Sequence, residues 1–193
     1  MKRAFLIHGW EGNPENAWFP WLKHELESRG FEVHTPAMPN PAEPKIEEWI
    51  PALAKEIGIP DSELCLIGHS IGCQSILRYL ETLPNTTKIA GIVLVAPWME
   101  LDTTTEEEGE EVKEIARPWM ETPIDFPKIK KMIGKSFAVF SDNDPYVPLS
   151  QGDVFLEKLG AEIVIESGKG HFGDFEKITE LPSALSSVEK LFV

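Results

Sequence analysis

A serine stands between two glycines in the stretch GHSIG, residues 68–72. The apolar run before it, residues 63–67, predicts a β-strand, and residues 73–83 after it have the apolar spacing of a helix. A serine on such a sharp strand-to-helix turn projects its hydroxyl above the sheet, and the glycines leave room for backbone to pass closely. The pattern therefore predicts that Ser70 is a nucleophile.

A serine hydroxyl is a weak nucleophile at neutral pH, so the chain must also supply a base. His171 is the best candidate, because it lies in the glycine-rich stretch SGKGHFGDF directly after the last predicted strand. We expect structural roles for His24, His34 and His69. His8, in the loop after the first predicted strand, is instead a candidate for the substrate pocket.

A third group must orient that base, and the stretch SDNDPYVP after the fifth predicted strand offers carboxylates. We favour Asp144, because Pro145 and Pro148 stiffen the loop that would hold it. Asp142 is expected to bond its own turn. Asp102, after the fourth predicted strand, is a further alternative.

The chain order Ser70, Asp144, His171 is the order of the catalytic triad in α/β-hydrolases. Such chemistry also needs N–H donors for the oxyanion. One is expected from Ile71, next to the serine, and one from Trp10 in the loop HGWEGNP, with the following residue as an alternative to Trp10.

Short apolar runs alternate with segments of helical spacing along the chain, which is typical of a parallel sheet covered by helices. The predicted strands are residues 3–7, 32–35, 63–67, 91–96, 136–140 and 161–165. The predicted helices lie near residues 18–28, 45–57, 73–83, 126–133, 150–159 and 182–191.

Residues 97–127 interrupt this alternation with an acidic run, EEEGEE at 106–111, and several prolines. We expect a cap or lid here, because loops at the carboxyl ends of parallel strands surround the ligand crevice. Trp98, Trp119 and Met120 are candidates to line the pocket. The alternatives are a solvated loop without a role and side chains that simply pack beneath it.

The length of 193 residues and the absence of any linker or repeat predict a single domain over residues 1–193. A formal net charge of −14 argues against a nucleic-acid partner, which needs clustered Lys and Arg. It also favours neutral or cationic substrates over anionic ones.

Only two cysteines are present, Cys65 and Cys73, and their spacing suits neither a disulfide framework nor a pair of metal ligands. We expect no metal and no organic cofactor. The sequence contains no run of the length of a signal-peptide core or a membrane span, so a cytoplasmic protein without a membrane partner is expected.

The stretches HGW, GHSIG, LRYLE, SDNDPYVP and GHF, together with residues 18–41, resemble the small serine hydrolase family of the α/β-hydrolase superfamily. That family includes the retinoblastoma-binding serine hydrolase and bacterial relatives. The resemblance covers nearly the whole chain and implies a compact three-layer fold with strand order 2-1-3-4-5-6 and the triad Ser70, Asp144 and His171. The Leu-x-Cys-x-Glu signature for retinoblastoma binding is absent.

Taken together, these patterns predict a serine hydrolase, most simply a carboxylesterase, that cleaves a small ester, thioester or amide through an acyl-enzyme. A peptidase or an acyltransferase could use the same triad. A protein-interaction module on a hydrolase fold with little activity is the alternative from another class.

Overall fold

The computed structural model describes residues 1–101 and 110–193 of the chain. Its six strands form one sheet in the order β2-β1-β3-β4-β5-β6, and every neighbouring pair is parallel. The strands are β1 (Arg3–Ile7), β2 (Glu32–His34), β3 (Leu64–His69), β4 (Ile89–Val95), β5 (Ile133–Ser141) and β6 (Glu162–Glu166). The predicted strand order is therefore confirmed.

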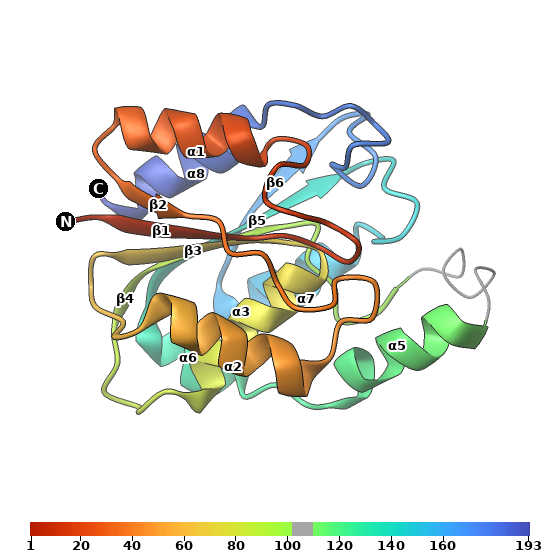
Figure 1. Cartoon of the computed structure of the whole chain (residues 1–193), viewed down its shortest axis with the longest axis horizontal. Helices are drawn as coiled ribbons and strands as arrows, with labels where there is room; N and C mark the ends of the chain where they lie inside the picture. Colours follow the sequence, from red (N-terminus) through yellow and green to blue (C-terminus); the bar gives the residue numbers. More distant parts are fainter. Residues whose placement is uncertain (102–109) are drawn as a thin grey trace.

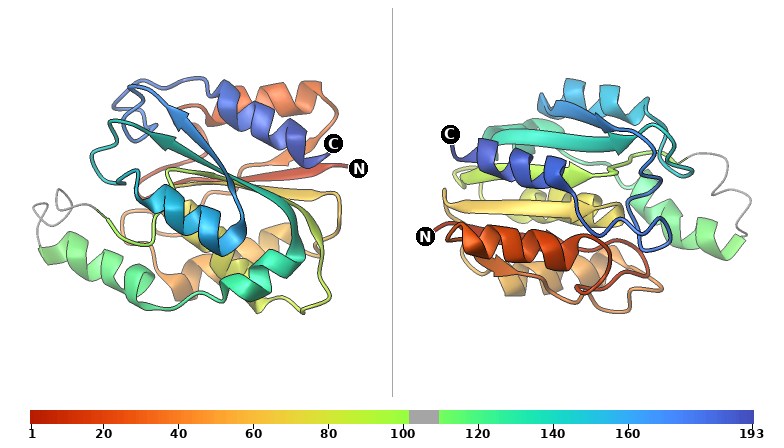
Figure 2. Two further views of the ribbon diagram at one scale, coloured as in Figure 1. Left: turned by 180° about the vertical axis from the view of Figure 1, so that it is seen from behind. Right: turned by 90° about the horizontal axis from the view of Figure 1, so that it is seen from above.

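Helices cover both faces of this sheet, as the alternating pattern predicts (Figure 1, Figure 2). Helices α1 (Phe19–Ser28) and α8 (Pro182–Leu191) lie on one face. The other face carries α2 (Ile46–Ile57), α3 (Ile71–Thr82), α6 (Phe126–Met132) and α7 (Gln151–Leu159). The result is a three-layer α/β-hydrolase fold.

The two central strands are buried from both sides, which explains their continuous apolar sequences. Residues 64–67 of β3 and 92–95 of β4 are fully shielded from solvent. Because all strands run in one direction, their carboxyl ends meet at one edge of the sheet. The loops that leave this edge carry every residue of the predicted triad.

Sequence and structure differ mainly in the segment after β4. Residues 110–121 form helix α5 (Glu110–Glu121), which was not among the predicted helices. Its apolar residues Val112, Ile115, Ala116 and Trp119 do follow helical spacing, but Pro118 and the acidic run obscure the pattern. Most of that run, and Asp102, lie outside the described residues.

Helix α5 lies beyond the carboxyl ends of the strands, on the side of α2 and α3 (Figure 1). Buried side chains of α3 hold both ends of residues 97–127, the cap segment. Gln74 donates to the carbonyl of Trp98 at 3.1 Å, and Arg78 donates to the carbonyls of Trp119 at 2.7 Å and Thr122 at 2.9 Å. In the described residues, no helix has the length and apolar character needed to cross a membrane.

Candidate active site

Ser70 lies at the sharp turn between β3 and α3, and its backbone is strained as the GHSIG pattern predicts. Its φ is 52° and its ψ is −122°, a backbone conformation that residues other than glycine rarely adopt. Such a conformation costs on the order of 1–3 kcal/mol and persists only where its surroundings enforce it. Here the Ser70 N–H donates to the carbonyl of Val95 at 2.9 Å, which anchors the turn to β4.

The flanking glycines are required by close backbone approach on both sides of Ser70. A Cβ atom on Gly68 would lie 2.8 Å from the nitrogen of Cys73, inside the first turn of α3. A Cβ atom on Gly72 would lie 2.4 Å from the carbonyl oxygen of Ile7 at the end of β1. Neither clash can be relieved by a side-chain rotation, because the opposing atoms belong to the backbone. The glycines therefore allow the turn at Ser70, the nucleophile elbow, to pack against the sheet.

His171 and Asp144 meet over the same edge of the sheet. Nδ1 of His171 lies 2.8 Å from Oδ2 of Asp144, whose side chain is only 2% exposed. The other carboxylate oxygen accepts the backbone N–H groups of Tyr146 at 2.9 Å and Val147 at 3.1 Å. The carboxylate is thus fixed by its own turn and can orient the imidazole ring.

The loop that carries His171 is attached to the loop that carries Asp144. Gly168 donates its N–H to Asp142 Oδ1 at 2.8 Å, and Gly170 donates to Asn143 Oδ1 at 2.8 Å. The hydrogen bond from Gly168, aided by the hydroxyl of Ser167, lowers the pKa of Asp142. Asp142 therefore holds the histidine loop and does not contact the imidazole.

His69, for which the sequence predicts a structural role, contacts the backbone of the loop that carries His171. Its Nε2 lies 2.7 Å from the backbone carbonyl of His171, so this nitrogen carries the proton and donates it. Burial, and then repulsion from His171, lower the pKa of His69 to about 3. His69 therefore stays neutral near neutral pH and holds the backbone of the histidine loop.

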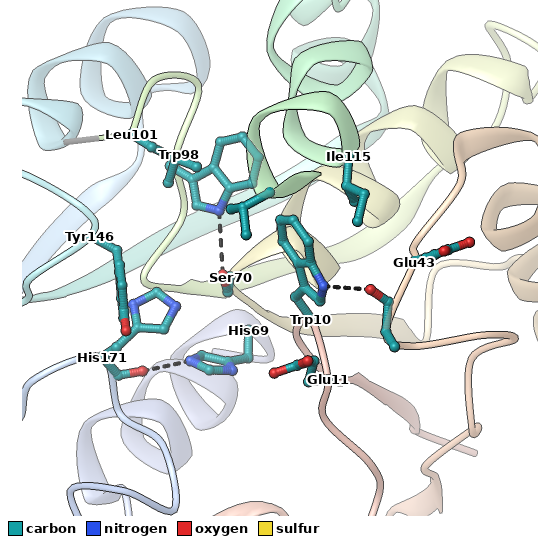
Figure 3. A pocket seen from close by; sticks show the side chains of 12 residues that line it. Trp10, Glu11, Glu43, His69, Ser70, Trp98, Leu101, Ile115, Tyr146 and His171 are labelled. Carbon is teal, nitrogen blue, oxygen red and sulfur yellow. Dashed lines mark hydrogen bonds between the residues drawn. The ribbon is translucent and has the colours of Figure 1, made fainter. Parts of the chain in front are cut away.

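Ser70 is 8% exposed. Its hydroxyl oxygen accepts a hydrogen bond from Trp98 Nε1 at 3.3 Å (Figure 3). Within the described part of the chain, no hydrogen bond joins it to His171. Contacts between a nucleophile and its base are often long before substrate binds. The sequence pointed to Trp98 as a pocket residue, but not to this hydrogen bond.

The predicted oxyanion donors are the backbone N–H groups of Ile71 and of Trp10, with Glu11 as the alternative to Trp10. Ile71 is the first residue of α3, where helices leave their N–H groups free. The N–H of Glu11 donates to the carbonyl of Pro41 at 2.8 Å and is therefore engaged. The N–H of Trp10 donates to no backbone carbonyl among the described residues. Of the two alternatives in this loop, Trp10 is thus the one with a donor to offer.

A cavity of about 510 Å³ opens above Ser70 and His171 (Figure 3). Its aliphatic lining comes from the cap segment, through Leu101, Val112 and Ile115. Aromatic, acidic and other lining residues complete it: Trp10, Glu11, Ala42, Glu43, His69, Trp98 and Tyr146. The candidate nucleophile and base therefore line the same cavity as these aliphatic side chains.

Comparison with known proteins agrees with this architecture. The model of the family described as "Serine hydrolase" matches residues 4–190. The chain belongs to the serine hydrolase family. The putative hydrolase YdeN of Bacillus subtilis is 30% identical over 181 residues, which cover 94% of this chain and 91% of YdeN. The serine hydrolase RBBP9 of Rattus norvegicus is 26% identical over 177 residues, 90% of this chain and 89% of RBBP9.

Solved structures show the same fold. The crystal structure of the ydeN gene product from B. subtilis superposes on this serine hydrolase with a TM-score of 0.89 at 28% identity, and covers 100% of this chain and 99% of its own. Est1E from Butyrivibrio proteoclasticus, solved with ferulic acid bound, has a TM-score of 0.73 at 15% identity, over 100% of this chain and 90% of its own. At that identity the likeness concerns the fold alone.

Three residues predicted to line the pocket do not belong to its described lining. His8 is buried, and its Nε2 accepts the N–H of Met38 at 3.0 Å while Nδ1 donates to the carbonyl of Gly9 at 2.8 Å. Burial lowers the pKa of His8, so its ring is a neutral structural element of this serine hydrolase.

The other two residues lie on α5 but do not face the cavity. The buried indole of Trp119 donates to the carbonyl of Pro44 at 2.9 Å and packs α5 against the proline-rich loop before α2. Met120 is 37% exposed on the outer side of the helix. Val112 and Ile115 line the cavity instead; they lie on the same side of α5 as Trp119, but two turns and one turn nearer the start of the helix.

Proposed function

We propose that this serine hydrolase cleaves a small ester, thioester or amide through an acyl-enzyme on Ser70. One observation carries the proposal: a serine in a strained elbow shares a cavity with a histidine whose Nδ1 lies 2.8 Å from a buried carboxylate. A protein that only binds a partner has no physical need for that strain.

In the proposed mechanism, His171 Nε2 takes the proton of Ser70 as Oγ bonds to the carbonyl carbon. The carbonyl π electrons move onto oxygen, and the N–H groups of Trp10 and Ile71 stabilise this negative charge. When the intermediate collapses, the bond to the leaving group breaks and His171 gives the leaving group its proton. Asp144 keeps Nδ1 protonated and stabilises the imidazolium.

Water completes the cycle by the same route. His171 takes a proton from water, the resulting hydroxide attacks the acyl carbon, and the bond to Ser70 Oγ breaks. The proton on His171 then returns to Oγ, and a carboxylic acid is released. No step of this chemistry requires a metal or an organic cofactor. A peptidase or an acyltransferase would differ only in the leaving group or in the nucleophile that accepts the acyl group.

The lining of the cavity supports a carboxylesterase for substrates of modest size. The aliphatic residues of the cap segment suit an apolar acyl group, whereas Glu11 and Glu43 disfavour an anionic substrate. Neutral or cationic compounds are therefore the expected substrates.

The test is labelling of the purified protein with a fluorophosphonate, a reagent specific for activated serines, with mass spectrometry of the modified peptide. Stoichiometric labelling is expected at Ser70 and none in Ser70→Ala, which should also lose on the order of 10⁴- to 10⁶-fold in kcat. A panel of p-nitrophenyl esters with neutral and carboxylate-bearing acyl groups should show faster turnover of the neutral ones. A folded wild-type protein that resists labelling and cleaves none of the esters would favour the interaction module.

A further inference from the structure

The hydrogen bond between Trp98 and Ser70 brings a buried donor directly onto the candidate nucleophile. Trp98 Nε1 lies 3.3 Å from Ser70 Oγ, and Trp98 is 1% exposed. An indole N–H can only donate, so Ser70 Oγ must be the acceptor. The Ser70 proton is left free to point elsewhere. The contact is thus compatible with a simultaneous hydrogen bond from the Ser70 hydroxyl to a base.

The position of this indole is set by the core of the protein. The carbonyl of Trp98 accepts the side chain of Gln74, which lies one turn beyond Ser70 on α3. The next N–H, that of Met99, donates to the buried Gln151 on α7 at 2.8 Å. The donor and the nucleophile are therefore both anchored to α3.

We propose that the Trp98 indole N–H is a catalytic hydrogen-bond donor that stabilises negative charge on Ser70 Oγ. The inference rests on the proposed acyl-enzyme mechanism and adds to it a donor on the nucleophile itself. The oxyanion donors act on a different atom, the carbonyl oxygen of the substrate.

Oγ carries the greatest negative charge at two moments of that mechanism. The first comes as His171 removes its proton, before the bond to the acyl carbon is complete. The second comes at the end, when the acyl carbon–Oγ bond breaks and its electron pair stays on Oγ until His171 returns the proton. Trp98 transfers no proton in either step. Its hydrogen bond shortens and strengthens as charge develops, because bonds to charged acceptors are stronger than neutral ones.

The same contact could act in the opposite sense, by holding the hydroxyl in an orientation that His171 cannot use. The two roles predict opposite effects on the reaction rate when the N–H is removed. A catalytic donor makes its removal costly, whereas a restraining contact makes its removal beneficial.

Trp98→Phe removes the N–H and keeps an aromatic ring in the cavity. We expect it to lower both the second-order rate of fluorophosphonate labelling and kcat for a p-nitrophenyl ester by about 10- to 100-fold, the effect of one hydrogen bond to a charged atom. KM should change little, because the charge exists only during reaction. The matched control is Trp49→Phe, which removes a buried indole N–H that donates to the Pro39 carbonyl. It should keep the labelling rate within about two-fold.

A second variant covers the case in which phenylalanine disturbs packing. Replacement of Trp98 by β-(3-benzothienyl)alanine exchanges the N–H for sulfur and keeps the bicyclic shape, so it should show the same loss as Trp98→Phe. An unchanged or raised labelling rate in either folded variant overturns the role of Trp98 and leaves the proposed function intact. A wild-type protein that is never labelled overturns both.

Discussion

Two regions face each other across the cavity: the loops that carry Asp144 and His171, and the cap segment. They are stabilised by different kinds of contact. The triad loops, residues 141–147 and 167–173, are joined by backbone N–H groups of the second loop that donate to Asp142 and Asn143. Asp144 accepts a backbone N–H from its own turn. The cap segment, residues 97–127, is held at its ends by α3 and α7 and presents aliphatic side chains to the cavity. The comparison teaches that polar contacts fix the reacting groups, whereas apolar surface shapes the space for substrate.

Of the changes considered, replacing the buried carboxylate of Asp144 should have the largest effect on the reaction rate. Asp144→Asn is expected to lower kcat by roughly 10³- to 10⁴-fold, because the amide no longer stabilises the protonated, correctly oriented His171. Steady-state kinetics with a p-nitrophenyl ester measure the loss. Asp142→Asn is the matched control, since its carbonyl oxygen can still accept the Gly168 N–H. A rate within about three-fold of wild type is expected for an exposed site. The reverse pattern would assign the acid to Asp142.

A change at the cap anchor should affect stability and substrate binding more than chemistry. Arg78→Met leaves the buried carbonyl of Trp119 and the partly buried carbonyl of Thr122 without their donor. The free energy of unfolding should fall by about 2–4 kcal/mol, which urea denaturation measures. KM should rise while kcat changes less, because the aliphatic wall is displaced and the triad loops are not. Arg117→Met, on an exposed position of the same cap, should change neither quantity. A large fall in kcat with an unchanged KM would contradict the division of roles.

The smallest expected effect is on acid stability, through His69. Folded His69 stays neutral down to about pH 3, whereas the unfolded side chain takes up a proton near pH 6.5. Between these values the unfolded state binds more protons, so the free energy of unfolding falls as the pH falls. From pH 6.5 to 4.5 this amounts to about 2 kcal/mol. His69→Gln can still donate to the His171 carbonyl and should lose that much less over the same range in urea denaturation. Equal acid sensitivity of the two proteins would show that His69 does not stay neutral.

Most of the fold could be predicted from the sequence, because its signals are local. Apolar runs in β3 and β4 report burial on both faces, and the glycines around Ser70 report a turn that tolerates no side chain. Helix α5 was missed, although the spacing of Val112, Ile115 and Trp119 carried its signal. A proline and a run of like charges hid that spacing.

Some features of the site could likewise be predicted from local sequence, and others could not. GHSIG, SDNDPYVP and GHF each lie at a strand end, so the sequence by itself determined the turn at Ser70, the family and the candidate acid and base. Only the tertiary structure decided that His8 is buried and bonded to Met38, that His69 holds the His171 carbonyl and that Trp98 donates to Ser70. These contacts join segments far apart in the chain, and their hydrogen-bond directions depend on how the loops pack. No local pattern of residue types records that packing.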